Sequence, residues 1–220
     1  MGLLTEIIKF IADGGIWMWP IMTAGAVGIA IFVERYMLLA SITRQNKKVW
    51  DQLHPVLVAG DFENARKITE GDKSTISRLL SLGLALQGAV RRRDDLEIGM
   101  EEGMMEVIPQ LEKRTHYIAL LANIATLLGL LGTVMGLIAA FTATAHAAPA
   151  EKADLLAAAI SVGMNCTAFG LLFGIPLMIL HSYIVSMTAG VVASLEMASV
   201  KTINIITSST KRIGNAKVAA

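Results

Sequence analysis

The sequence predicts an all-α integral membrane protein with three transmembrane helices, a large helical cytoplasmic insert between the first and the second, and long helices that extend into the cytoplasm. Hydrophobic residues make up 54% of the 220 residues and charged residues 17%. The mean hydropathy of +0.59 is well above that of an ordinary soluble domain of this size. Three long stretches also carry no charged residue, and the charges gather between and after them.

The first transmembrane helix is predicted at residues 16–42, after an N-terminal helix at residues 1–15. The N-terminal segment is amphipathic and lacks the basic start and cleavage site of a signal peptide, so we expect it to be retained on the periplasmic membrane surface. Trp17 and Trp19 lie at the start of the uncharged run, where an aromatic belt marks the interface. Pro20 fits the first turn of the helix.

Residues 43–116 are expected to form a cytoplasmic domain, a soluble helical hairpin rather than a core. His54–Pro55 and Gly60–Asp61 are turn signals. Asp61 is placed to cap a short helix that carries Ala65 and Ile68 on its apolar side.

A second polar helix is expected to begin at Asp94–Asp95 and to kink at Pro109. It carries a series of acidic residues towards the membrane. If no break separates it from the second span, the combined helix is roughly 70 Å long at about 1.5 Å per residue.

The second and third transmembrane helices are predicted at residues 117–142 and 155–187, joined by a periplasmic loop at residues 143–154. The uncharged stretch of the second is roughly 37 Å long as a helix, enough to cross a hydrocarbon core of about 30 Å with some tilt. The uncharged stretch of the third is longer than one crossing needs. Residues 188–220 are therefore expected to leave the membrane as an amphipathic cytoplasmic helix and tail.

Lysine and arginine residues set the predicted orientation. The loop between the second and third spans holds Lys152 alone, whereas the insert is rich in both: Arg44, Lys47, Lys48, Arg66, Lys67, Lys73, Arg78, Arg91, Arg92, Arg93, Lys113 and Arg114. By the positive-inside rule the insert and the C-terminal tail are cytoplasmic, and the N-terminus is periplasmic.

The second and third spans share a pattern of small residues with steps of four, three and four: Gly129, Thr133, Gly136 and Ala140 in one, and Gly163, Thr167, Gly170 and Gly174 in the other. Such spacing puts each set on one helix face. Small residues on a face let helices approach closely, so tight packing is the more conservative interpretation of the glycines.

The threonines allow two interpretations. Thr133 and Thr167 lie near mid-membrane at comparable depth, and each hydroxyl can simply bond the backbone carbonyl one turn back. Together with Thr126, Asn123 and Asn165, however, they form a polar track that suits water or an ion.

The two spans contain no Asp, Glu, Lys or Arg, so a mid-membrane proton relay needs a carboxylate from another subunit. His181 is too near the cytoplasmic end for that role, and an interfacial or capping role fits it better. The net charge of +1 gives no basic excess for nucleic acid.

Three other classes of function are alternatives. A secondary transporter needs internal repeats and broken spans around a substrate site, which three spans without a repeat do not offer. A membrane enzyme needs a nucleophile or metal constellation, but His116, His146 and His181 lie apart at span ends or in the loop, and Cys166 is the single cysteine. We expect no enzymatic activity, no cofactor and no metal. A non-conducting membrane scaffold is the third class.

Three stretches, in order and at matching spacing, resemble the TolQ/ExbB branch of the TolQ/ExbB/MotA proton-channel family. They are Gly14–Pro20 through Val33–Glu34–Arg35, then Leu128–Leu137, then Thr167–Leu171 ending at Ile175–Pro176. Glu34 and Arg35 are part of this resemblance, although an interfacial ion pair that anchors the helix end explains them as well.

The resemblance implies a homopentamer in the bacterial inner membrane around two copies of a single-span ExbD/TolR/MotB-like partner with a membrane aspartate. It implies that Thr133 and Thr167 match the pore threonines that face this aspartate. Gly129, Gly136, Gly163, Gly170 and Gly174 are assigned to close packing and to the partner-facing side. Proton passage would rotate the ring and send force to the periplasm or outer membrane, with a TonB/TolA-like energy transducer as a further partner.

One position departs from the family pattern. Many ExbB and TolQ sequences carry a glutamate five residues before the third-span threonine, where this chain has Val162. A stator of a gliding or flagellar motor, driven by protons or by sodium, is therefore the alternative.

Overall fold

The protein is described by a computed structural model that covers residues 14–87, 92–145 and 147–218, with side chains up to residue 209. The described elements are all helices, α2 to α7 in chain order. Within the described ranges, three helical stretches are long and apolar enough to cross a membrane: Met18–Ala59, Arg93–Ala145 and Lys152–Ser209. The predicted all-α membrane fold is confirmed, whereas the predicted N-terminal helix falls almost wholly outside the described residues.

The chain divides into two compact units, which we treat separately. The membrane unit comprises residues 1–35 and 114–184, and the insert unit comprises residues 36–113 and 185–220. Two long helices, α2 (Met18–Ala59) and α7 (Lys152–Val218), contribute residues to both units.

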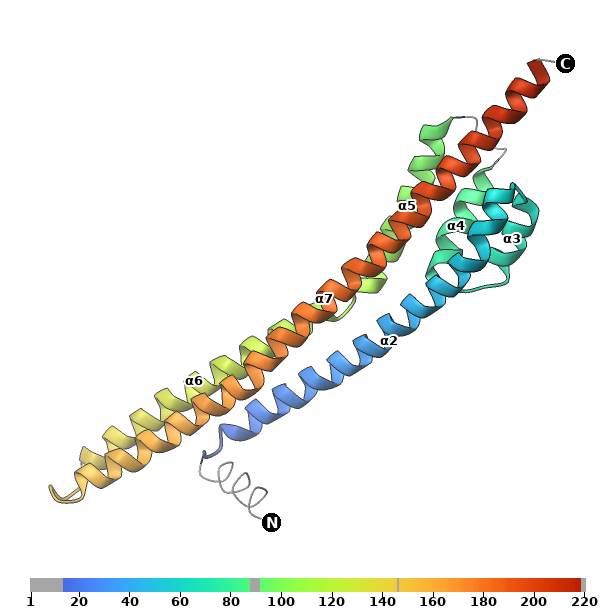
Figure 1. The fold of residues 1–220 in the computed structure, drawn as a ribbon. Coiled ribbons are helices and arrows are strands. Elements are labelled where there is room, and N and C mark those ends of the chain that lie inside the picture. The colour runs from blue at the N-terminus through green and yellow to red at the C-terminus, as the bar shows by residue number, and fades with distance from the viewer. Residues whose placement is uncertain (1–13, 88–91, 146, 219–220) are drawn as a thin grey trace, which may run out of the picture. The chain divides into compact units, whose positions relative to one another are not determined.

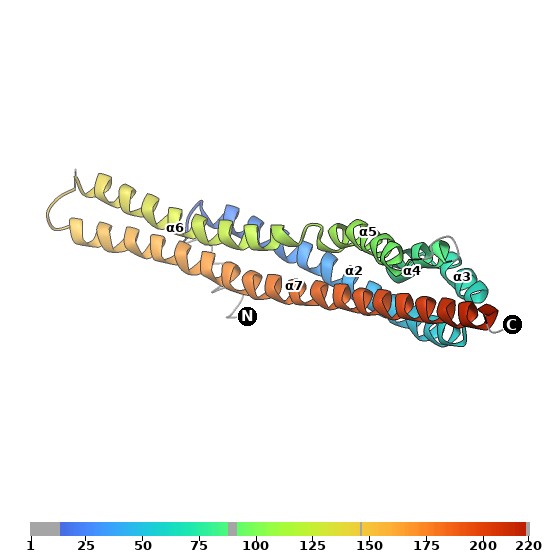
Figure 2. The same cartoon turned by 90° about the horizontal axis from the view of Figure 1, so that it is seen from above.

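In the membrane unit, α6 (Thr115–Ala145) and the first part of α7 lie side by side, as Figures 1 and 2 both show. The start of α2 packs against this pair through Met18, Ile21 and Ala24, which share a buried cluster with Ala125 and Phe169. Pro20 lies in the first turn of α2, as predicted. Many large apolar side chains of this unit remain exposed, as expected of helices that contact lipid.

The insert unit contains α3 (Phe62–Glu70), α4 (Thr75–Leu86) and α5 (Arg93–Glu112), together with the second parts of α2 and α7. Helix α4 contacts both α3 and α5. Its fully buried leucines, together with those of α2, give the unit a core of its own: Leu53, Leu57, Leu79, Leu80 and Leu84. The expectation of a hairpin without a core was wrong, because the second parts of α2 and α7 complete a multi-helix arrangement that a hairpin lacks.

Two predicted helix starts in the insert unit are confirmed. The carboxylate of Asp61 accepts a hydrogen bond from the Asn64 backbone N–H at 3.1 Å, which satisfies one free donor at the start of α3. Ala65 is buried and Ile68 half-buried on this helix. The first turn of α5 carries Asp94 and Asp95, whose charges suit a helix N-terminus.

The predicted turn at His54–Pro55 was wrong, because α2 continues through it to Ala59. Gly60, whose φ is +78°, follows the end of the helix. Pro55 removes one backbone donor, but Leu53 and Leu57 on either side of it are fully buried. Packing of this apolar face therefore outweighs the lost hydrogen bond.

The chain breaks between α5 and α6, so the two do not form one 70 Å helix. Helix α5 passes Pro109 without ending and stops at Glu112. Arg114 then adopts a φ of +64°, in the left-handed region. In contrast, α7 runs unbroken from Lys152, so the third span and the following amphipathic segment are one helix.

Candidate functional site

The small residues of α6 and α7 meet in one contact, which we call the seam: Gly129, Thr133, Gly136, Gly163, Thr167, Gly170 and Gly174. A Cβ atom added to Gly129 would lie 2.8 Å from the Cys166 carbonyl oxygen and 3.1 Å from the Gly170 Cα. A Cβ on Gly170 would lie 2.7 Å from the Ala125 carbonyl oxygen. The two backbones are therefore in direct contact, and no side chain larger than hydrogen fits at these positions.

The seam continues in both directions from this contact, in antiparallel register. A Cβ on Gly136 would lie 3.5 Å from the Gly163 Cα, and one on Gly163 would lie 3.1 Å from the Thr133 Cα. At the other end, a Cβ on Gly174 would meet Thr126 Oγ1 and lie 3.2 Å from the Ala122 carbonyl oxygen. The structure thus assigns each glycine of the pattern a partner on the opposite helix.

Thr133 and Thr167 form a hydrogen-bonded pair in the middle of the seam. Thr133 Oγ1 also lies within donating distance of the carbonyl oxygens of Gly163, at 2.9 Å, and Gly129, at 3.3 Å. Thr167 Oγ1 lies 3.2 Å from the same Gly129 oxygen. Each hydroxyl has only one proton, so one hydroxyl donates to the other while the second donates to a carbonyl. The pair therefore has several alternative hydrogen-bond patterns.

The other members of the predicted polar track contribute less. Thr126 Oγ1 donates to the Ala122 carbonyl at 3.1 Å, which is the local backbone bond expected of a threonine in a membrane helix. Asn165 is half-buried and lies two residues from Thr167, so it occupies another face of α7. Asn123 is exposed. The two central threonines are the part of the track that the structure brings together.

A contact that the sequence pattern did not predict joins the residues just before α2 to α7, beside the seam. The Cys166 thiol donates to the Gly14 carbonyl at 2.9 Å, and Cys166 is 1% exposed. A Cβ on Gly132 would lie 2.7 Å from the Cys166 Cβ and 3.4 Å from the Trp17 Cβ. In the sequence, this contact was indicated only by Gly132, which lies one helical turn from Gly136 but outside the small-residue pattern.

Glu34 forms an ion pair with Arg114, a residue far from it in the sequence. The Glu34 Oε1 and Arg114 Nη1 atoms are 2.7 Å apart, and both side chains are about half exposed. The neighbouring Arg35 is buried, with 4% of its surface exposed. Trp19, one of the two predicted belt tryptophans, is 63% exposed.

The seam offers hydroxyls and carbonyls but no titratable carboxylate. The spans on either side of it carry no Asp, Glu, Lys or Arg. In the part of the chain that the structure describes, no three His, Cys, Asp or Glu side chains gather to hold a metal ion. By itself the seam can donate and accept hydrogen bonds.

Comparisons with known proteins place these features in a wider group. Residues 72–197 match the MotA/TolQ/ExbB proton channel family. The chain is similar to biopolymer transport protein exbB1 of Vibrio cholerae, with 28% identity over 74% of this chain and 72% of that protein. It is also similar to a putative biopolymer transport protein ExbB homolog of Methanothermobacter thermautotrophicus (25% identity, 81% of this chain, 62% of that protein). A third relative is the putative biopolymer transport protein ExbB-like 3 of Synechocystis (26% identity, 74% of this chain, 77% of that protein).

Proposed function

The chain belongs to the MotA/TolQ/ExbB proton channel family, and from this premise we propose that it is the channel-forming subunit of an inner-membrane motor that couples the proton motive force to mechanical work. It is a multi-pass membrane protein with three apolar helical stretches among its described residues. The observation that carries the proposal is the Thr133–Thr167 pair. It places two hydroxyls with alternative hydrogen-bond partners in a seam without charged residues. The proposed role is not enzymatic.

The proposal includes a partner, because the spans hold no carboxylate. A single-span ExbD/TolR/MotB-like protein with a membrane aspartate would supply the titrating group. A homopentamer of this chain would surround it, with the N-terminus in the periplasm and the C-terminus in the cytoplasm. A TonB/TolA-like transducer would carry the work onwards. The names of the relatives, biopolymer transport proteins, support this branch of the family.

In the proposed mechanism, a rotating hydroxyl binds the charged form of the partner's aspartate. A hydroxyl of the pair donates to a backbone carbonyl at rest, for example that of Gly163 at 2.9 Å. Turning its proton towards a carboxylate exchanges a neutral hydrogen bond for a charge-assisted one, which is about twice as strong. This makes the ionised carboxylate tolerable at low dielectric, and protonation then releases it.

The energy available suits such a step. A unit charge that crosses 100 mV releases about 2.3 kcal/mol. Exchange of one hydrogen bond within the pair involves about 0.5–1.5 kcal/mol. One proton therefore supplies enough free energy to bias a rotation between equivalent states.

The test is proton flux in liposomes that contain the full chain with its co-purified partner. T133V/T167V preserves side-chain shape but removes both hydroxyls, and we expect it to lower the flux at least tenfold, about 1.4 kcal/mol in the barrier. T133S/T167S keeps the hydroxyls and is expected to conduct. Thr126→Val is the matched control, because Thr126 lies against Gly174 at the end of the seam but bonds its own backbone.

Two results separate this proposal from its rivals. Wild-type flux in T133V/T167V, with a wild-type assembly mass, would leave the pair a packing role only and favour a non-conducting scaffold. A flux that follows a sodium gradient instead of a proton gradient would favour the alternative of a sodium-driven motility stator. Mass spectrometry of the purified complex is expected to find a small single-span protein with one membrane aspartate.

A further inference from the structure

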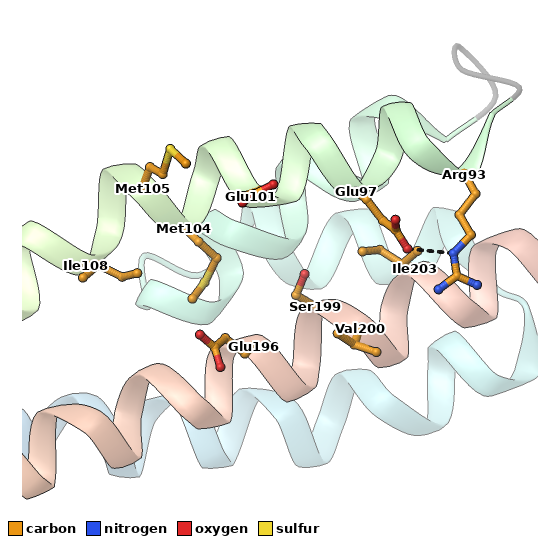
Figure 3. Close-up of a pocket in the computed structure, with 10 residues that line it drawn as sticks. All are labelled: Arg93, Glu97, Glu101, Met104, Met105, Ile108, Glu196, Ser199, Val200 and Ile203. Carbon is orange, nitrogen blue, oxygen red and sulfur yellow. Dashed lines mark hydrogen bonds and ion pairs between the residues drawn. The ribbon is translucent and has the colours of Figure 1, made fainter.

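A groove of about 380 Å³ lies between α5 and the second part of α7, entirely within the insert unit. Figure 3 shows its two walls: Arg93, Glu97, Glu101, Met104, Met105 and Ile108 from α5, and Glu196, Ser199, Val200 and Ile203 from α7. The seam lies in the other unit, so nothing in the proposed ion path uses this groove.

The groove has an apolar floor with exposed parts. Met104 and Ile203 are buried, whereas Met105 is 65% exposed and Val200 is 53% exposed. Methionine is unbranched and polarisable, so it adapts to differently shaped apolar side chains. A floor of this kind binds apolar side chains of an incoming segment without demanding one particular shape.

The rim of the groove is acidic and partly unpaired. Glu97 is neutralised by Arg93, with Nε and Oε1 at 2.7 Å. Glu101 and Glu196, from opposite walls, form no ion pair with any described residue. Helix α5 adds to this charge, since it carries seven acidic residues and one basic residue. An apolar floor beneath two free carboxylates complements a ligand with apolar anchors flanked by positive charges.

We propose that this groove docks a basic amphipathic peptide segment of another polypeptide. Its apolar side chains would lie on Met105 and Val200, and its lysines or arginines would pair with Glu101 and Glu196. The volume is near the low end of the roughly 300–1,000 Å³ of ligand pockets, so it takes a few anchoring side chains. A short helix that presents residues at i, i+3 and i+4 fits this demand.

The test uses the full chain in nanodiscs of zwitterionic lipid. The probe is a fluorescent Leu/Lys peptide of about four helical turns with leucines on one face. A peptide with the same composition but scrambled order tests amphipathicity, and a Leu/Glu counterpart tests charge. Empty nanodiscs measure binding to lipid, which is subtracted.

Two pairs of variants isolate the groove. E101K/E196K reverses the rim charges, and E102K/E112K makes the same change at exposed α5 positions outside the groove. Met105→Gln alters the floor, and Ile98→Gln alters an equally exposed apolar residue of α5, 63% against 65%, that does not line the groove.

We expect E101K/E196K to weaken binding of the basic peptide by about tenfold or more, because two ion pairs become repulsive. Met105→Gln is expected to weaken it several-fold, and both control variants should stay within about twofold of the wild type. T133V/T167V is expected to bind as the wild type does, which separates this test from that of the ion path.

Three results would overturn the proposal. The first is equal affinity of the wild type for the basic, scrambled and acidic peptides. The second is an equal loss in E102K/E112K, which would mean unspecific attraction to α5. The third is that the wild type does not bind the basic peptide while E101K/E196K has a different oligomer mass from the wild type, measured by light scattering. This result would assign the groove to a second copy of this chain.

Discussion

The membrane unit and the insert unit hold their helices together in different ways. In the membrane unit, α6 and α7 meet backbone to backbone, and a Cβ on Gly170 would lie 2.7 Å from the Ala125 carbonyl oxygen. In the insert unit, large side chains fill the space between helices, and Leu53, Leu79 and Leu80 are fully buried.

Lipid and water favour these two kinds of helix packing differently. Water drives leucines together because their burial removes apolar surface from water. Lipid gives no such advantage, so membrane helices gain contact mainly from close approach and interhelical hydrogen bonds. The same chain therefore uses glycine and threonine in one unit and leucine in the other, and this contrast can be tested at single residues.

The largest effect is expected from Leu80→Ala in the insert unit. Leu80 is fully buried, and its truncation leaves a cavity that is expected to cost about 2–5 kcal/mol. Thermal unfolding in detergent measures the loss, and hydrogen exchange of α4 locates it. Leu172→Ala is the matched control, because Leu172 is 64% exposed in the membrane unit and is expected to change little. Equal losses in both variants would contradict the assignment of a separate leucine core to the insert unit.

Gly170→Ala and Gly190→Ala, both in α7, are expected to act in opposite directions. At Gly170 one methyl group meets backbone atoms that cannot move aside, so we expect a loss of about 1–3 kcal/mol. At Gly190 nothing lies within 4 Å, and removal of a helical glycine is expected to stabilise by about 0.5–1 kcal/mol. Unfolding curves of the two variants test this. Stabilisation of both variants would show that helix propensity, and not steric contact in the seam, decides the effect at Gly170.

The smallest effects are expected from the ion pairs. Glu34–Arg114 in the membrane unit and Arg78–Glu106 in the insert unit are both about half exposed or more. Double-mutant cycles with Gln are expected to give couplings of about 0.2–1 kcal/mol for each pair, with salt lowering both. A coupling of several kcal/mol for Glu34–Arg114 alone would show that this pair is far less hydrated than its exposure indicates.

The sequence predicted the positions of the helices better than the contacts between them. Uncharged runs gave the spans, Asp61 and Asp94–Asp95 marked helix starts, and the spacing of four, three and four identified the faces of α6 and α7 that form the seam. The turn predicted at His54–Pro55 failed because local turn chemistry takes no account of the leucines packed on either side.

By itself, then, the sequence determined the membrane class, the three apolar stretches and the helix faces that carry small residues. These features depend on the free energy of transferring side chains out of water and on the helical period of 3.6 residues. Both are properties of a single segment of the chain. Only the tertiary structure decided that Thr133 meets Thr167, that Glu34 pairs with Arg114, and that Cys166 bonds Gly14. Such pairings join residues far apart in the chain, and they are set by the register in which whole helices pack, a sum over many contacts that no single segment contains.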